Sequence, residues 1–126
     1  MSIVFDASAL LLLLNKEPGH ELVETHLSKA VMSAVNMAEV LTVLAGLGVP
    51  SADAINITSS LIADIVSFDE TQAASSASLR AITKPYGLSL GDRACLALAL
   101  HHQLPVITAD KIWKKIKLPI DIILAR

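Results

Sequence analysis

The stretch IVFDASALLLLL, residues 3–14, joins a short β-branched and aromatic run to a leucine-rich run through a single acid, Asp6. β-branched and aromatic residues favour strands, whereas a longer apolar run favours a helix. We therefore predict a strand over residues 3–5 that passes directly into a helix ending at Asn15. Asp6 marks the junction between the two.

The rest of the chain repeats this alternation. Four more strands are predicted, at residues 30–35, 62–68, 104–108 and 120–124. Helices are predicted between them, at residues 21–29, from Asn36 to Gly46 or Gly48, from Ser51, from Asp69 to about Thr83, and from Ser89 through Leu100. Alternating strands and helices indicate βαβ units, so the predicted fold class is α/β, with a parallel sheet covered by helices on both faces.

The size and composition indicate one globular domain. The 126 residues can bury a core but are too few to divide in two, so we expect a single domain over residues 1–126. The chain is 53% hydrophobic and only 17% charged, unlike chains that stay unfolded. Because so small a body has much surface, we expect part of its apolar surplus to lie in a subunit or partner interface. Light scattering that finds only monomer would contradict this.

The sequence gives no sign of a membrane or secreted protein. The longest apolar runs, 9–14 and 94–100, are far shorter than the roughly 20 residues of a membrane span. The N-terminus has no basic segment, and Asp6 enters where a signal peptide needs apolar residues. The single cysteine, Cys95, lies in an apolar run and is interpreted as a small buried hydrophobe. We expect a cytoplasmic protein.

The net charge of −2 argues at first against a polyanionic partner. Four acids, however, are gathered in positions considered below. Setting them aside leaves 12 − 4 = 8 acidic residues against 10 basic ones. The remaining surface is then mildly positive, which permits RNA as a partner.

The four acids are Asp6, Glu39, Asp92 and Asp110. Each has a structural explanation as a helix cap. Asp6 and Asp110 occupy N-cap positions, and the segments 36–39 and 89–92 have the spacing of capping boxes. The helix dipole also favours carboxylates there. Taken singly, capping is the better interpretation of any one of them.

The joint placement of these acids predicts a site. A helix that follows a parallel strand begins at the strand's carboxyl edge, so Asp6, Glu39 and Asp110 fall along one rim of the sheet. Asp92 precedes a strand, and it joins them if the loop before it runs back over the rim. Open α/β sheets bind ligands at this rim. By the same logic Asp69 also lies on the rim, unless its outer strand holds it away from the crevice.

A shared location has an electrostatic consequence. Two carboxylates about 5 Å apart repel by roughly 3 kcal/mol at an effective dielectric constant of about 20, so a cluster must take up protons or bind cations. All candidate ligands are oxygens, which selects Mg²⁺ or Mn²⁺ over Zn²⁺. Without a serine or cysteine nucleophile motif, the pattern points to metal-activated water. The histidines are assigned to helix surfaces and helix ends: His20, His26, His101 and His102.

Four segments of the chain resemble the successive motifs of PIN-domain nucleases. They are VFDASALL at residues 4–11, VNMAEV at 35–40, LSLGDRACLALA at 88–99 and VITADKIW at 106–113. The resemblance is greatest to VapC-type toxins of bacterial toxin-antitoxin pairs. Order, spacing and total length agree across essentially the whole chain, although no single motif is specific by itself.

This resemblance implies a PIN-like α/β/α sandwich whose central parallel sheet has the order 3-2-1-4-5. It further implies a homodimer, Mg²⁺-dependent endoribonuclease activity restrained by a cognate VapB-type antitoxin, and a bacterial or archaeal cytoplasmic setting. The expected substrate is structured RNA such as transfer RNA. A role in RNA processing is the alternative to a toxin, because PIN domains serve there as well.

Carried over residue by residue, Asp6 and Asp92 resemble the principal metal ligands of the family. Glu39 and Asp110 complete the acidic pocket, directly or through metal-bound water. Two hydroxyls occupy positions similar to those that steady the cluster: Ser8 and Thr108. The implied reaction is in-line hydrolysis of a phosphodiester by water that one or two metal ions activate, with no protein nucleophile.

Substrate contacts are less determined. The basic residues near the acids either meet phosphates or form solvated helix faces, and they are Arg93, Lys111, Lys114, Lys115 and Lys117. Trp113 either stacks on a base or packs in the core beside Ile112 and Ile116.

Two other functions compete with a nuclease. A phosphoacceptor receiver also gathers aspartates on the rim of a parallel sheet, but it needs adjacent acids after the first strand, and Asp6 stands alone. A PIN-fold module that binds RNA or protein without cutting is the second, and the intact set of acids argues against it. A nuclease assay with Mn²⁺ and with EDTA distinguishes them.

Overall fold

The sheet has the predicted topology. The structure, a computed structural model, describes all residues from Met1 to Arg126. Its five strands are β1 (Ile3–Phe5), β2 (Ala30–Ser33), β3 (Asp64–Val66), β4 (Val106–Thr108) and β5 (Ile122–Leu124). They form one sheet in the order β3-β2-β1-β4-β5, and every pair is parallel. The expected α/β fold and the strand order 3-2-1-4-5 are thereby confirmed.

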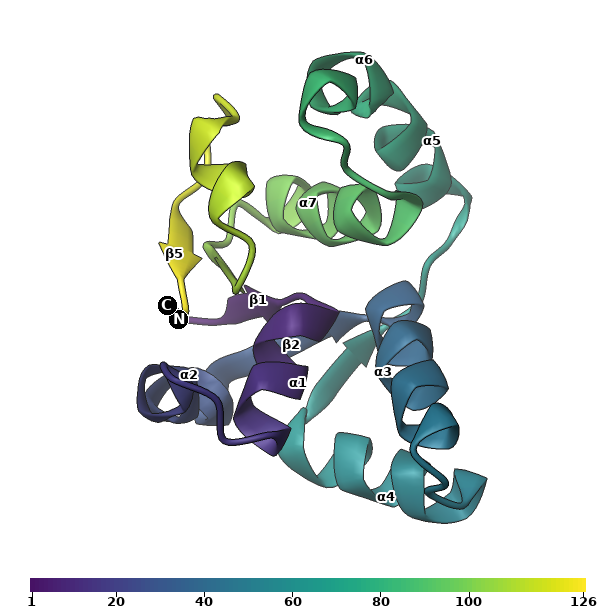
Figure 1. The fold of residues 1–126 in the computed structure, drawn as a ribbon. Helices are drawn as coiled ribbons and strands as arrows, with labels where there is room; N and C mark the ends of the chain where they lie inside the picture. The colour runs from purple at the N-terminus through teal and green to yellow at the C-terminus, as the bar shows by residue number, and fades with distance from the viewer.

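Helices cover both faces of this sheet. One face carries α1 (Ala7–Leu14), α2 (His20–His26), α3 (Ala34–Gly46) and α4 (Ser51–Leu61). The other carries α5 (Glu70–Ser78), α6 (Arg80–Thr83) and α7 (Leu90–His102), with α7 between the sheet and α5 (Figure 1). Three short 3₁₀ helices complete the chain: η1 (Leu27–Lys29), η2 (Lys84–Tyr86) and η3 (Lys111–Lys115). No helix has the length and apolar content needed to cross a bilayer.

Alternating side chains of the strands build two separate cores. Ile3 and Phe5 of β1 are buried with the helices α1 to α4, whereas Val4 between them is buried with α7. In β2, Met32 and Val31 divide in the same way. Side chains of a strand point to opposite faces in turn. Because both faces are covered, the central strand β1 is apolar at all three of its positions.

One helix begins earlier than predicted. The start of α3 is Ala34 rather than Asn36, because Ser33 is the N-cap and its Oγ accepts a hydrogen bond from the Val35 amide at 3.2 Å. Asn36 is therefore not a cap but lies inside the first turn. Hydroxyl side chains are strong N-caps, so the earlier start is physically favoured.

Another helix is interrupted. The predicted helix from Asp69 to Thr83 is two helices, α5 and α6, separated at Leu79. The Leu79 amide there bonds to the carbonyls of both Ser75 and Ser76, and the Ser76 carbonyl also accepts a bond from Nη1 of Arg93. Strand β3 is also shorter than predicted, because it lies at the edge of the sheet and pairs only with β2.

Candidate active site

Asp6 is the central acid of the rim. It follows β1 and caps α1, with Oδ1 accepting a bond from the Ala9 amide at 2.9 Å. The Ser8 hydroxyl contacts both carboxylate oxygens, at 2.7 and 2.9 Å, and the Thr108 hydroxyl donates to Oδ2 at 2.6 Å. Asp6 is only 4% exposed. Its carboxylate is therefore held by groups from two neighbouring strand ends.

Burial changes the acidity of Asp6. Loss of hydration raises its pKa from 3.8 to about 6, although hydrogen bonds from Thr108, Ser8 and Ala9 act in the opposite direction. The carboxylate of Asp92 raises the pKa further. No lysine, arginine or histidine forms an ion pair with any of the four acids. Asp6 is thus a buried carboxylate without a compensating cation.

The two predicted hydroxyls connect Asp6 to the end of β4. Ser8 Oγ accepts a bond from the Ala109 amide at 2.9 Å, and Thr108 Oγ1 accepts one from the Asp110 amide at 3.1 Å. The Asp110 carboxylate itself is exposed and caps η3 through the Ile112 amide at 3.1 Å. Asp110 therefore reaches the network through its backbone, while its side chain lies outside it.

Asp92 and Glu39 approach Asp6 from two other helices. Asp92 lies in the first turn of α7, where it forms the predicted capping box with Ser89. Glu39, from α3, accepts a bond from Nδ2 of Asn36 at 2.8 Å. Burial raises the pKa of the Cys95 thiol, and the charges of Asp6, Asp92 and Glu39 raise it further. The negative charges of these three acids therefore all act on the same thiol, that of Cys95 on α7.

Asp69 does not belong to this group. It caps α5 and lines a surface hollow with His101 and His102, the last residues of α7. Asp92 lies at the other end of that helix, whose length is roughly 20 Å. The alternative that placed Asp69 beside the other acids is therefore wrong. The edge strand β3 carries it away from the crevice.

The acids are neighbours without forming a closed set of ligands. No three aspartate, glutamate, histidine or cysteine side chains are close enough to hold one ion together as they stand. None of the five surface hollows is lined by any of the four acids. Each of the four carboxylates instead accepts a hydrogen bond from a backbone amide or a side chain.

The chemistry of these groups fits a hard divalent cation. All available donors are oxygens, which Mg²⁺ and Mn²⁺ prefer. Ionisation of a buried carboxylate is costly, but it becomes favourable once a positive charge lies beside the carboxylate. Asp6 has this requirement, because nothing in the protein neutralises it.

Residues 3–118 match the PIN domain. The chain belongs to the PIN-domain family. This is a family of nucleases, in agreement with the resemblance of the four sequence motifs. No curated protein matches the sequence.

Solved structures share the fold of this PIN domain over nearly its whole length. A DNA-bound VapBC from Salmonella typhimurium has a TM-score of 0.74 at 16% identity, with 100% of this chain and 99% of that chain covered. A toxin-antitoxin complex from Klebsiella pneumoniae has a TM-score of 0.69 at 23% identity, covering 95% and 99%. FitAcB from Neisseria gonorrhoeae has a TM-score of 0.70 at 23% identity, with 98% of this chain and 97% of that chain covered. At these identities the likeness establishes the fold.

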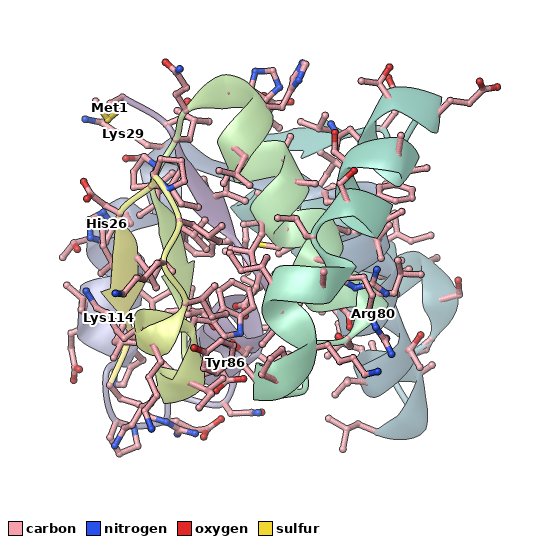
Figure 2. All side chains as sticks on the ribbon, turned by 90° about the horizontal axis from the view of Figure 1, so that it is seen from above. Met1, His26, Lys29, Arg80, Tyr86 and Lys114 are labelled. Atoms are coloured by element: carbon pink, nitrogen blue, oxygen red, sulfur yellow. The ribbon has the colours of Figure 1, made fainter.

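Basic residues lie toward the carboxyl edge of the sheet. Figure 2 shows Lys114 and Arg80 below the middle of the molecule, to the left and right of Tyr86. Met1 and Lys29, which precede β1 and β2, lie at the upper side (Figure 2). The lower side is therefore the carboxyl edge of the sheet. The four lysines predicted near the acids are all exposed: Lys111, Lys114, Lys115 and Lys117.

Two residues proposed as possible substrate contacts have structural roles instead. Arg93 is turned toward α5, where its Nη1 donates to the Ser76 carbonyl at 3.1 Å. Trp113 is fully buried in the core beneath α7, so no face of its ring is free to stack on a base. For Trp113 the core interpretation is confirmed.

Sequence reasoning missed the role of Asn36. Its spacing from Glu39 was visible, but the pair was interpreted as a capping box at a helix start. In the structure Asn36 is 1% exposed and its amide binds the Glu39 carboxylate. A signal was available, because Ser33 offers a hydroxyl N-cap three residues earlier, and a start there places Asn36 inside the helix.

Proposed function

We propose that this PIN domain is an endoribonuclease that hydrolyses phosphodiester bonds of RNA with the help of Mg²⁺ or Mn²⁺. The observation that carries the proposal is the buried, uncompensated carboxylate of Asp6 with Asp92 beside it. In the proposed site Asp6 and Asp92 are the principal metal ligands, and Glu39 and Asp110 act directly or through metal-bound water. The exposed lysines beyond Asp110 are placed to meet the phosphate backbone.

The protein's own groups prepare this chemistry. A divalent ion, when bound, would supply positive charge for the scissile phosphate and lower the pKa of an attacking water. Ser8 and Thr108 orient Asp6 and favour its ionised form, since both donate hydrogen bonds to the carboxylate. Cys95 is fully buried with a raised pKa, so it is not available as a nucleophile. Water is therefore the proposed attacking group.

The first prediction concerns the metal. Purified protein incubated with structured RNA such as transfer RNA should cleave it in Mg²⁺ or Mn²⁺ and should lose the activity in excess EDTA. Readdition of Mn²⁺ should restore cleavage. Products are read on denaturing gels. RNA binding without cleavage under every metal condition would instead support a binding module.

We further propose that the protein is a VapC-type toxin of a bacterial or archaeal cytoplasm, restrained by a VapB-type antitoxin. The proposal is supported by the neighbours, which are toxin-antitoxin complexes. A homodimer is also proposed, supported by exposed apolar side chains on α3, at its C-cap and on α4: Val43, Leu47 and Ile55. Expression alone should arrest growth, and expression with the adjacent gene should relieve the arrest.

An apolar groove between α1, α2 and α4 is the surface we assign to the antitoxin. It is the largest of the five hollows, about 470 Å³, and four leucines line it: Leu13, Leu14, Leu27 and Leu61. Lys16, His20 and Glu24 complete its lining. A partner segment with an apolar centre and polar flanks matches this pattern. Its centre would cover the leucines, and its flanks would meet the polar residues at the border of the groove.

The second prediction tests this groove. Replacing Leu61 by Asp should weaken binding of the adjacent gene's product at least tenfold, since a charge in an apolar contact costs about 1.4 kcal/mol or more. Ile82→Asp is the control, because Ile82 is 43% exposed and lies on α6 outside the groove. Light scattering gives the mass of each complex and of the chain alone, where the proposed dimer is twice 13.3 kDa. Equal binding by both variants would contradict the assignment.

A further inference from the structure

Asn36 joins two helices at the edge of the acidic rim. Its side chain is 1% exposed, and Nδ2 donates to Oε1 of Glu39 at 2.8 Å and to the Gly91 carbonyl at 3.0 Å. Glu39 is on α3, and Gly91 is in the first turn of α7, next to Asp92. One amide group therefore connects the helix that carries Glu39 with the helix that carries Asp92.

The chemistry of its partners fixes the orientation of this amide. A carboxylate oxygen and a backbone carbonyl can only accept, so Asn36 must turn its NH₂ group toward them. Both N–H bonds of Nδ2 are then used. Oδ1 is buried and has no partner in the protein. Burying an unpaired oxygen is unfavourable, which argues that the two donated bonds are what this position requires.

Gly91 provides the second part of the arrangement. A Cβ atom there would lie 2.6 Å from Cδ and Oε1 of Glu39, and it would be closer still to Oε2. Alanine stabilises helices relative to glycine, so this glycine is not explained by helix formation. Its absent side chain is the space that the Glu39 carboxylate occupies. Asn36 and Gly91 thus place Glu39 against the first turn of α7.

We propose that Asn36 is a positioning residue that holds the Glu39 carboxylate beside Asp92, in the place where a metal ion would need it. This inference rests on the proposed metal-dependent function. Glu39 and Asp92 repel each other, and Glu39 is only partly buried, so without its donor the side chain is free to turn to water. Groups that orient metal ligands typically change metal affinity by about 10 to 100-fold.

Titration of the protein with Mn²⁺, measured by calorimetry below the unfolding temperature, tests the role of Asn36. Asn36→Ala should weaken Mn²⁺ binding at least tenfold. In a Glu39→Ala background the same change should have no further effect, because the proposed role of Asn36 is to hold Glu39. Thr58→Val is the matched control, since Thr58 is also fully buried and bonded to a helix carbonyl, but on α4. It should leave Mn²⁺ affinity unchanged.

Gly91→Ala gives an independent test that does not remove a buried polar group. It should weaken Mn²⁺ binding as Asn36→Ala does, because the new methyl group displaces Glu39. In the Glu39→Ala background it should be harmless and should raise the unfolding temperature, as expected for alanine in a helix.

The outcomes separate the two proposals. If the unchanged protein binds no Mn²⁺, the proposed function and this inference both fail. If it binds Mn²⁺ but Asn36→Ala binds equally well, or if the effects of Asn36→Ala and Glu39→Ala simply add, only the positioning role is refuted. Loss of affinity that disappears without Glu39 supports it.

Discussion

Replacing Asp6 with asparagine should lower metal-dependent RNA cleavage at least a hundredfold while making the metal-free protein more stable at about pH 7.5. A hundredfold loss corresponds to about 2.7 kcal/mol of transition-state stabilisation, a modest share of what a bound metal supplies. Asparagine has nearly the same shape as aspartate, but it brings no negative charge to the proposed metal. Cleavage is measured with Mn²⁺ at saturation, so that weaker metal binding does not account for the whole loss.

The gain in stability follows from the acidity of Asp6. Its pKa is about 6 in the folded protein against 3.8 as the ordinary value, so the folded state holds a proton more tightly than the unfolded state. Stability from this group is therefore fully present below about pH 4 and is lost as the pH rises to about 6. About 2 pKa units correspond to roughly 3 kcal/mol. Because asparagine remains neutral, we expect it to recover about 1 to 2 kcal/mol after some loss of hydrogen bonding.

Denaturant unfolding in EDTA at about pH 4.5 and about pH 7.5 measures this difference. The advantage of Asp6→Asn should be present at the higher pH and should shrink at the lower one, where Asp6 is largely protonated. Asp69→Asn is the control, because Asp69 caps α5 at the opposite end of α7 and is exposed. Undiminished cleavage by Asp6→Asn would refute the active-site assignment. A variant no more stable at about pH 7.5 would refute the desolvation account.

The fold was predictable because its signals are local and repeated. β1 is a short apolar run followed by Asp6, which begins α1, and this whole signal lies within residues 3–14. The errors lie where tertiary contacts decide. Next to the break at Leu79, the carbonyl of Ser76 accepts a bond from Arg93, which is distant in sequence. A single-sequence pattern has no access to such a contact.

The candidate site was predictable to the level of a rim but not to the level of contacts. That a helix after a parallel strand begins at the carboxyl edge was enough to place Asp6 near Thr108. The bond from Asn36 to the Gly91 carbonyl spans 55 residues and has no sequence signature. Asp69 satisfied the same rule as Asp6 yet lies elsewhere, since β3 is an edge strand. The topology places residues at the carboxyl edge of the sheet, and the packing of the helices decides which side chains come into contact there.

The penultimate residue Ala125 contacts Gly19 on one side and the end of β4 on the other. Gly19 lies in the turn between α1 and α2 with φ of +100°, and a Cβ atom there would overlap the Ala125 carbonyl group. The Ala125 amide donates to the Thr108 carbonyl at 2.8 Å, and the Thr108 hydroxyl binds Asp6. Nearby, Arg126 pairs with Glu17 at 2.8 Å. Gly19 therefore contacts Ala125, which is bonded directly to Thr108, one of the residues that hold Asp6.

Gly19→Ala should therefore destabilise the protein by about 3 kcal/mol or more, because left-handed backbone costs alanine about 1 to 2 kcal/mol and the overlap with backbone adds to it. Gly48→Ala is the matched control: its φ is +85° but nothing lies within 4 Å, so only the backbone cost of about 1 to 2 kcal/mol should appear. Urea unfolding of both variants isolates the contact from the conformation. Equal losses would show that Ala125 moves aside freely. A larger loss at Gly19 would show that the Ala125 carbonyl is held firmly in place.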